Sequence, residues 1–316
     1  MDLTEMIPNT AELQGTEQRM SKEEFAAMKK QEREDTWMQI DAQAQEVFRD
    51  GDALQRFLDF MAGQYNMPRV PNLLLLYSQN PKIHLVRSWE EWRQENRFIQ
   101  PDAREYTYII QTEYEKDGVM RQGYAIGKGY DVADTSGKPP EERTGQELQT
   151  LLAAVLKNQE IRLQVADELP EGVQAQYIPK QRTIYIRNGM SEVTTFHAIS
   201  RELACARLDQ HDGNYKRSKV NAQAYCAAYV VGKYYGIDVA GFELGRVAGM
   251  QENGQKDPQE LRAFLKDVRN AAYSIRGHIN RELQGPEQEF VADDLFAVGE
   301  GPKPAKGRKS KEQPER

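Results

Sequence analysis

The spacing of hydrophobic residues switches repeatedly along this chain, and the switches limit the folds that it can adopt. Between residues 21 and 80 the apolar residues recur every three or four positions, as in helices that bury one face. Short strand-like runs follow at residues 83–86, 106–111, 121–126, 130–132, 161–165, 174–178 and 183–187. Helical spacing returns at residues 89–96, 147–156, 192–208, 220–235 and 258–283. The chain is therefore predicted to be α+β, with strands and helices grouped in blocks.

Local signals fix several of these boundaries. Ser21 followed by Glu24 forms a capping box at the start of a highly charged helix, which Asp50-Gly51 interrupts. Asn80-Pro81 ends a short leucine-rich helix, and Asp257 followed by Pro258 marks the start of the last long helix. These signals place helix ends within a few residues.

The polar, turn-rich segment 136–145 is predicted to be a linker between two domains. The first twenty residues show no periodicity, and the pattern fades again after residue 285. The predicted organisation is a flexible arm (1–20), an N-terminal α+β domain (21–135), the linker, a helix-rich α+β domain (146–285) and a disordered basic tail (286–316).

Composition excludes several classes of protein. No run of the 316 residues approaches the roughly 18 apolar residues of a membrane span, and the start lacks the pattern of a signal peptide, so we expect a cytoplasmic protein that does not bind membranes. Two cysteines, Cys205 and Cys226, cannot form a disulfide framework. A net charge of -7 argues against a broad surface for nucleic acid, so any such contact is expected to be local.

The segment SEVTTFHAISRELACARL, residues 191–208, carries the most specific chemistry. In zinc peptidases a helix of this kind bears His-Glu-x-x-His, in which two imidazoles one turn apart hold zinc and the Glu acts as general base. The corresponding residues here are Arg201, Glu202, Leu203, Ala204 and Cys205. Glu202 keeps the position of the base, while neither histidine is present.

Three pieces of the second domain, in order, support a resemblance to a known family. They are RTIYIRNGMSE, the helix just quoted, and AYVVGKYYGIDVAGFELGRVAGM. With NLLLLYSQNPKIHLVRSWEEWRQENRF and GYDVADTSGKP in the first domain, the chain resembles ArdC-type antirestriction proteins and their LtrC-like relatives on conjugative elements. The resemblance implies an N-terminal domain that binds single-stranded DNA (ssDNA), followed by a zincin-like metallopeptidase domain.

The resemblance also implies zinc, but every ligand position is changed. The two histidine positions correspond to Arg201, a permanent cation, and Cys205, and the position of the third ligand corresponds to Tyr225. Without a metal the water beside Glu202 keeps a pKa far above neutrality. We therefore predict no catalytic residue, with Glu202 a remnant, no metal site and no cofactor. A hydrogen-bonded network of Arg201, Glu202 and Tyr225 is the structure expected in place of the metal.

A remodelled site remains as the alternative. His197, Arg201 and Cys205 share one helix face at four-residue spacing, and Cys226 lies on the next helix. Cys205, Cys226 and His197, with His211, are conceivable zinc ligands. Arg201 in the middle of that face argues against this set, and small buried thiols in helix packing are the simpler interpretation.

A binding site for ssDNA needs cations for phosphates and aromatic faces for bases. The first domain supplies both, and the predicted DNA-binding residues are Arg69, Tyr77, Arg87, Trp92, Arg93, Arg97, Arg104 and Tyr106. The alternative is that the tryptophans are core anchors and the arginines a solvated face. Where relatives carry a basic turn this chain has Gln100-Pro101-Asp102, so binding is expected to be weak and sensitive to salt. The basic tail is a second candidate for phosphate contact.

The function expected from the sequence is a non-catalytic, antirestriction-type ssDNA-binding protein of a conjugative element. Its second domain would be a pseudo-metallopeptidase that stabilises the first domain or docks a protein partner. Two alternatives are an active metallopeptidase with remodelled ligands and a protein-protein adaptor that does not bind DNA.

Overall fold

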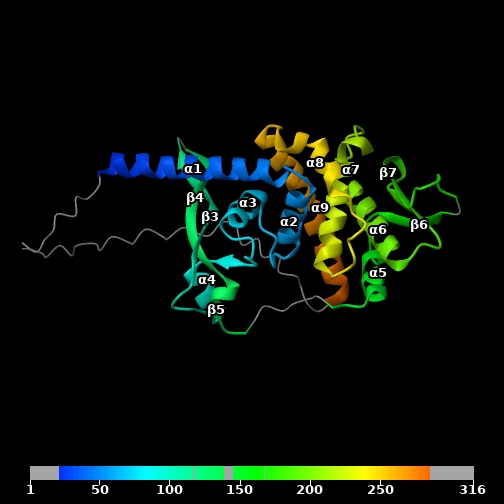
Figure 1. Cartoon of the computed structure of the whole chain (residues 1–316), viewed down its shortest axis with the longest axis horizontal. Helices are drawn as coiled ribbons and strands as arrows, with labels where there is room; N and C mark the ends of the chain where they lie inside the picture. Colours follow the sequence, from blue (N-terminus) through cyan, green and yellow to red (C-terminus); the bar gives the residue numbers. More distant parts are fainter. Residues whose placement is uncertain (1–20, 117, 139–144, 167, 285–316) are drawn as a thin grey trace, which may run out of the picture. The chain divides into compact units, whose positions relative to one another are not determined.

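The computed structural model describes residues 21–116, 118–138, 145–166 and 168–284 (Figure 1). It contains both helices and small sheets, so the predicted α+β class is confirmed. The chain divides into two compact units, residues 1–38 and residues 39–316. The predicted arm and tail lie outside the described residues. None of the described helices is long and apolar enough to span a membrane.

The described part of the first unit belongs to helix α1 (Lys22–Val47). The predicted capping box is present, since Ser21 N donates to Glu24 Oε2 at 2.8 Å and Glu24 N donates to Ser21 Oγ at 3.2 Å. Farther along, the hydroxyl of Thr36 donates to the carbonyl of Glu32 at 2.7 Å. Side chains paired along the helix surface, such as Lys29 with Glu32, support an otherwise highly charged segment.

The second unit begins in the same helix, where Ile40, Ala44, Val47 and Phe48 are buried as their spacing predicts. Helices α2 (Gly51–Ala62) and α3 (Val70–Gln79) follow. Asp50 caps α2 by accepting from Ala53 N at 2.7 Å, which explains why the helical pattern is interrupted there.

A three-stranded antiparallel sheet of order β1-β4-β3 comes next. It is built from β1 (Val86–Arg87), β3 (Glu105–Lys116) and β4 (Val119–Asp131), with α4 (Trp89–Gln94) after β1, and β2 (Phe98–Ile99) pairs with β5 (Thr135–Ser136) in a second small sheet. The prediction of two strands at 121–126 and 130–132 is wrong, because β4 is continuous. Gly129 does not break the strand: a Cβ there would lie 2.5 Å from the carbonyl oxygen of Arg87, so the close pairing with β1 requires a glycine.

Two amides of α3 bind the open edge of β3. Asn72 donates to Ile109 O at 2.9 Å and accepts from Ile109 N at 2.7 Å. Gln79 donates to Thr107 O and accepts from Thr107 N, both at 2.8 Å. The two side chains, seven residues apart on one helix face, occupy the hydrogen-bonding positions that a neighbouring strand would fill.

Within the described residues, the helix-rich half contains a mixed sheet and five α-helices (Figure 1). Its sheet has the order β6-β8-β7, with β6 parallel and β7 antiparallel to β8. The elements are α5 (Leu148–Leu156), β6 (Arg162–Ala166), β7 (Ala175–Ile178), β8 (Thr183–Arg187), α6 (Glu192–Arg207), α7 (Arg217–Tyr234), α8 (Leu244–Met250) and α9 (Pro258–Gln284). The periodic segments of this half were therefore predicted correctly, while the short α8 was not.

Side chains of the helix-rich half hold the end of α2 and the loop that follows it. Arg276, which is 3% exposed, donates to the carbonyls of Gln64 and Tyr65, both at 2.9 Å. Tyr229 donates its hydroxyl to Asp59 Oδ1 at 2.7 Å. The predicted linker lies in part outside the described residues, and the predicted domain boundaries stay a prediction.

Candidate functional site

Helix α6 carries the residues that the sequence singles out for chemistry. Ser191 caps it by accepting from Thr194 N at 3.2 Å, and Phe196, Ile199 and Leu203 are buried on its inner face. This packing fixes the register of the helix. Arg201, half-buried, and Glu202, which is 2% exposed, consequently point in adjacent directions on the side of β7 and α7.

Glu202 is fully engaged by protein groups. Its Oε2 accepts from the backbone N–H of Tyr177 in β7 at 2.7 Å and from Arg217 Nη1 in α7 at 2.6 Å. Arg217 Nη2 pairs with the other oxygen, Oε1, to complete a bidentate ion pair. Three donors therefore surround a buried carboxylate, which is the pattern of a structural ion pair rather than of a base poised over a water molecule.

Arg201 lies over the ring of Tyr225, with the guanidinium carbon 5.6 Å from the ring centroid. Its Nη2 donates to Asn221 Oδ1 at 2.6 Å. The expected contact between Arg201 and Tyr225 is therefore present, but Glu202 is not part of it and pairs with Arg217 instead. Arg217 was not predicted, because an Arg at the first residue of a helix carries no periodic signal.

Burial holds two of the candidate ligands, Cys205 and His197, in their neutral forms. Burial first, and the nearby charge of Glu202 second, raise the pKa of Cys205 to about 11, so its sulfur is a protonated thiol at neutral pH. Burial lowers the pKa of His197, and its Nε2 lies 2.7 Å from the carbonyl oxygen of Asp238, to which only an N–H can donate. Among the described residues, no three His, Cys, Asp or Glu side chains form a group that could hold a metal ion.

The remodelled set of Cys205, Cys226, His197 and His211 is therefore not assembled as a ligand group in the described structure. Cys226 is completely buried, and burial raises its pKa as well. His211 is instead an exposed neighbour of Asp209, with Nδ1 3.4 Å from the carboxylate. Both cysteines are free thiols in helix packing.

Two cavities flank Arg201. One, of about 310 Å³, lies between α6, α7 and the segment before α8, and it is lined by Thr194, His197, Tyr225 and Phe242 among others. The other, of about 300 Å³, lies between α6 and β7 beside Glu202 and Arg217. Gln174, Ala198 and Arg201 line both. The guanidinium of Arg201 thus stands at the junction of two hollows of ligand size.

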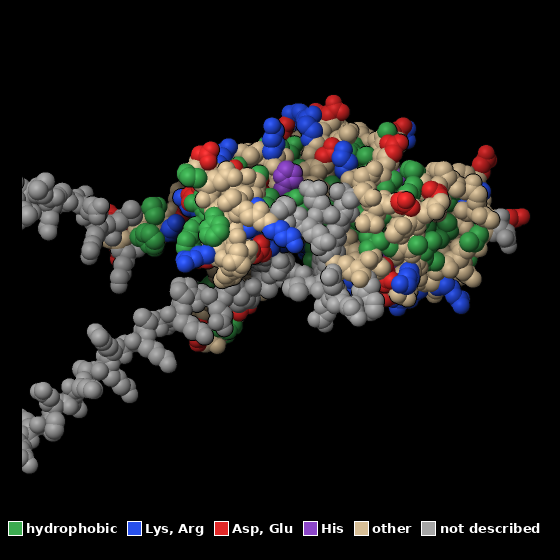
Figure 2. Space-filling model, turned by 90° about the horizontal axis from the view of Figure 1, so that it is seen from below, with side chains coloured by type: hydrophobic (Ala, Val, Ile, Leu, Met, Phe, Trp, Pro, Cys, Tyr) green, Lys and Arg blue, Asp and Glu red, His purple; other side chains and the backbone are tan. Residues whose placement is uncertain are grey.

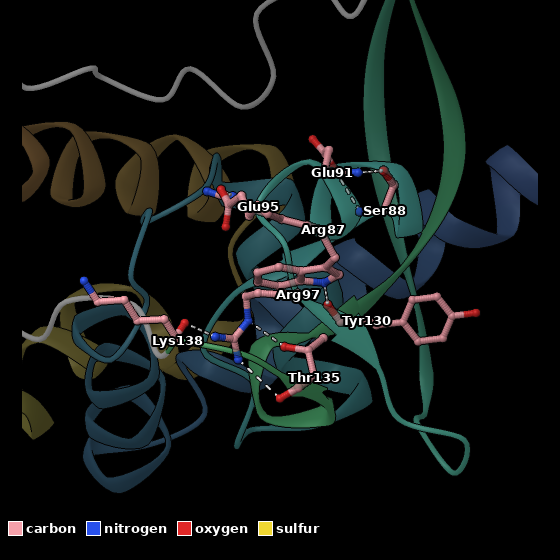
Figure 3. A network of polar contacts seen from close by, with 9 residues as sticks. Arg87, Ser88, Glu91, Glu95, Arg97, Tyr130, Thr135 and Lys138 are labelled. Carbon is pink, nitrogen blue, oxygen red and sulfur yellow. Dashed lines mark hydrogen bonds and ion pairs between the residues drawn. The ribbon is translucent and has the colours of Figure 1, made fainter.

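In the N-terminal half of the described chain (residues 21–138), a buried network contains three of the predicted DNA-binding residues (Figure 3). Trp92 is 0% exposed and donates Nε1–H to the carbonyl of Tyr130 at 2.8 Å. The guanidinium carbons of Arg87 and Arg97 lie 5.4 and 5.6 Å from the ring centroid of Trp92. Two cations therefore contact one buried indole, an arrangement in which cation–π attraction compensates part of their lost hydration.

Arg97 is bonded to oxygens on every side. Its Nε donates to Thr135 Oγ1 at 2.9 Å, and Nη2 donates to the carbonyls of Val132 and Thr135 at 3.3 and 3.2 Å. Nη1 donates to the carbonyl of Lys138. Since the side chain is only 7% exposed, Arg97 joins α4 to the turn that contains β5 and does not face solvent.

The other five predicted residues are placed differently from one another. Tyr106 is buried and its hydroxyl accepts from Asn80 Nδ2 at 2.9 Å, while the half-buried Tyr77 packs against Phe57 at 5.3 Å between ring centroids. Arg69, Arg93 and Arg104 are exposed. Arg69 donates to Gln111, Arg93 covers the ring of Trp89 at 5.1 Å, and Arg104 covers Tyr106 at 5.3 Å.

Further aromatic side chains on this half are exposed. Trp89 is 50% exposed, Phe98 67%, Tyr114 48% and Tyr124 47%. The sequence did not predict the exposure of Phe98, Tyr114 and Tyr124. Alternation along a strand separates its two faces, but it does not show which face other elements cover when the strand extends beyond its neighbours. Among the described residues on the face drawn in Figure 2, basic and acidic side chains are interspersed and form no continuous basic stripe.

Fold and side chains together describe an α+β chain in which Glu202 of α6 is held in a buried ion pair with Arg217 of α7. No protein-family model matches the chain, and no curated protein matches it either.

Among solved structures the chain is similar to two crystal structures of the antirestriction protein ArdC from the R388 plasmid. The metal-free structure has a TM-score of 0.42 at 12% identity, covering 67% of this chain and 85% of that chain. The Mn(II)-bound structure has a TM-score of 0.44 at 12% identity, covering 67% and 89%. At this degree of likeness, the role of each residue has to be inferred from its contacts in this chain.

Arg97→Met should destabilise the protein by about 2–4 kcal/mol, because the carbonyls of Val132, Thr135 and Lys138 each lose one donor. Urea unfolding followed by circular dichroism measures the change. Arg93→Met is the matched control, since this exposed residue of the same region should shift stability by no more than about 0.5 kcal/mol. Equal effects of the two substitutions would contradict the structural role of Arg97.

Glu202→Ala should also destabilise the protein, by about 2–4 kcal/mol, because Arg217 and the N–H of Tyr177 are left without their shared acceptor. The same urea titration applies. Glu160→Ala removes a 73% exposed partner of Arg207 and should change stability by less than about 1 kcal/mol. A neutral or stabilising effect of Glu202→Ala would show that the carboxylate is not held for the fold.

Proposed function

We propose that this chain is a non-catalytic, ssDNA-binding protein of the antirestriction type from a conjugative mobile element, acting in the cytoplasm. Its helix-rich half is a zincin-like pseudo-metallopeptidase that binds no zinc and serves to stabilise the chain or to dock a protein partner. No membrane contact is part of this function. The observation that carries the non-catalytic part is the complete engagement of Glu202 by Arg217 and Tyr177.

A peptidase glutamate must be free to take a proton from a metal-bound water. In this chain the carboxylate of Glu202 accepts from three donors, and the guanidinium of Arg217 covers both of its oxygens. Arg201 adds a permanent positive charge at the neighbouring position, which repels a metal cation. These contacts favour a scaffold role for α6 over hydrolysis.

The DNA-binding part of the proposal is supported by the exposed residues of the N-terminal half. Arg93 over Trp89 presents a cation and an aromatic face together, and Arg69 and Arg104 are further exposed cations of this half. The buried Arg87, Trp92 and Arg97 support the local fold in this scheme rather than the contact with DNA. Because acidic and basic residues nearly balance between residues 66 and 130, affinity should be low and fall steeply with salt.

Two other functions make different predictions for the same purified protein. A metallopeptidase with remodelled ligands requires bound metal, and an adaptor without DNA binding requires that oligonucleotides fail to bind.

Binding of ssDNA can be measured by the fluorescence anisotropy of a labelled oligonucleotide at low salt. We expect saturable binding that weakens as salt increases, and we expect Trp89→Ala and Arg93→Ala each to weaken it by about tenfold. Arg246→Ala removes an 80% exposed charge from α8 in the other half and should leave the affinity unchanged. Absence of saturable binding would exclude the proposed DNA contact and favour the adaptor.

Metal analysis of the purified protein by mass spectrometry separates the pseudo-enzyme from the peptidase. We expect less than about 0.1 zinc per chain, both before and after exposure to zinc followed by gel filtration, because no three potential ligand side chains are grouped in the described residues and Arg201 repels the ion. Cys205→Ser should not change this value. Stoichiometric zinc that is lost in Cys205→Ser would establish the remodelled site instead.

A further inference from the structure

The junction of the two cavities beside α6 contains a cation whose bonding is incomplete. Arg201 donates from Nη2 to Asn221, but its Nε is buried and has no hydrogen-bond partner. No described carboxylate lies within 4.0 Å of its nitrogen atoms, whereas the neighbouring Glu202 is taken by Arg217. A guanidinium N–H buried without an acceptor is costly, and an anion that pairs with the same guanidinium offsets part of this cost.

We infer that this junction is a binding site for a carboxylate that is attached to an apolar group. A guanidinium offers paired donors that match the two oxygens of a carboxylate, and a partly buried setting strengthens that bond. The ring of Tyr225, 5.6 Å from the guanidinium carbon, keeps Arg201 from swinging freely. The inference rests on the proposed absence of zinc, because a bound metal would compete for the same space.

The lining of the larger cavity defines the rest of the ligand. Phe242 and Tyr225 form an aromatic wall, with ring centroids 4.7 Å apart, and Val193 and Ala228 add apolar surface. Its volume of about 310 Å³ is at the lower end of the range for small-molecule sites, which suits one ring or one large side chain. The carboxylate is placed at Arg201 and the apolar group against this wall.

Three other titratable groups, Tyr225, Asp238 and His197, line the larger cavity, and none forms an ion pair with Arg201. The hydroxyl of Tyr225 accepts from Glu243 N at 2.7 Å. The carboxylate of Asp238 accepts from Ala240 N at 2.9 Å within its own turn. The imidazole of His197 is neutral at pH 7 because burial lowers its pKa, and its Nε2 is bonded to the carbonyl of Asp238. An entering carboxylate therefore meets the guanidinium of Arg201, which has no carboxylate partner, and the carboxylate of Asp238, which is bonded within its own turn.

The smaller cavity leads from the same guanidinium along β7, past Gln174, Ala175 and Gln176. It offers space beside a strand at the edge of its sheet, where an extended chain could continue away from the carboxylate. The carboxylate and its apolar group can thus belong to a free aromatic acid or to the carboxyl terminus of a peptide whose last residue is hydrophobic. Binding measurements with both kinds of ligand distinguish these sources.

Isothermal titration of the full chain tests the site with three probes. They are 3-phenylpropionate, the peptide N-acetyl-Ala-Ala-Phe with a free carboxylate, and the amide of that peptide. We expect saturable binding of at least one acid, with the amide about tenfold weaker or not bound, because it lacks the charge that pairs with Arg201. A peptide that binds more tightly than the free acid identifies a carboxyl terminus as the ligand, and the reverse identifies a small acid.

Variants locate the binding. Arg201→Met should weaken the binding of the acids by about tenfold or more, and Arg201→Lys should keep part of the affinity. Lys219→Met removes an exposed charge from α7 and should leave the affinity unchanged. Circular dichroism establishes that each variant is folded, and the comparison of acid with amide on the unaltered protein needs no variant. The inference would be overturned if neither acid binds, or if the amide binds as tightly as the peptide acid. It would also be overturned if folded Arg201→Met binds the acids as tightly as the unaltered protein. None of these results alters the zinc content or the ssDNA titration, which test the proposed function separately.

Discussion

The buried carboxylate of Glu202 is the interaction on which the helix-rich half depends. It joins three elements that are distant in sequence, since it lies on α6, accepts from the backbone of β7 and pairs with Arg217 at the start of α7. A carboxylate that is only 2% exposed is tolerated only when its partners are in place, so the ion pair fixes where β7 and α7 must lie relative to α6. Arg201, one residue earlier, is left outside this pair, and both cavities form around it.

The N-terminal half uses buried arginines in a different way. Arg97 has carbonyl and hydroxyl oxygens as its partners, and it shares the face of Trp92 with Arg87. In this half the residue types typical of nucleic-acid contacts therefore serve two purposes, since some build the core around Trp92 and others, such as Arg93, remain at the surface. Burial alone separates the two groups.

Long periodic segments could be predicted from the sequence, because a helix that buries one face must repeat its apolar residues, as α6 and α9 do. The capping box at Ser21 was also predicted, because capping depends on neighbouring residues. Asp50-Gly51 was predicted only as an interruption, and Asp50 is in fact the cap of α2. The continuity of β4 through Gly129 was not, since it depends on the distant Arg87. At the candidate site, the contact of Arg201 with Tyr225 was expected, whereas the choice of Arg217 as the partner of Glu202 depends on how α7 is placed and has no local signature.

The amides that bind β3 have a consequence for how copies of this chain behave in concentrated solution. An uncovered strand edge recruits other strands, which leads to aggregation or to exchange of segments between molecules. Asn72 and Gln79 occupy two successive outward-facing positions of that edge, Ile109 and Thr107, with side chains that cannot extend the sheet further. A helix thus closes the inner part of the sheet without a fourth strand, and the portion of β3 toward Glu113 is left as the place where another chain could add on.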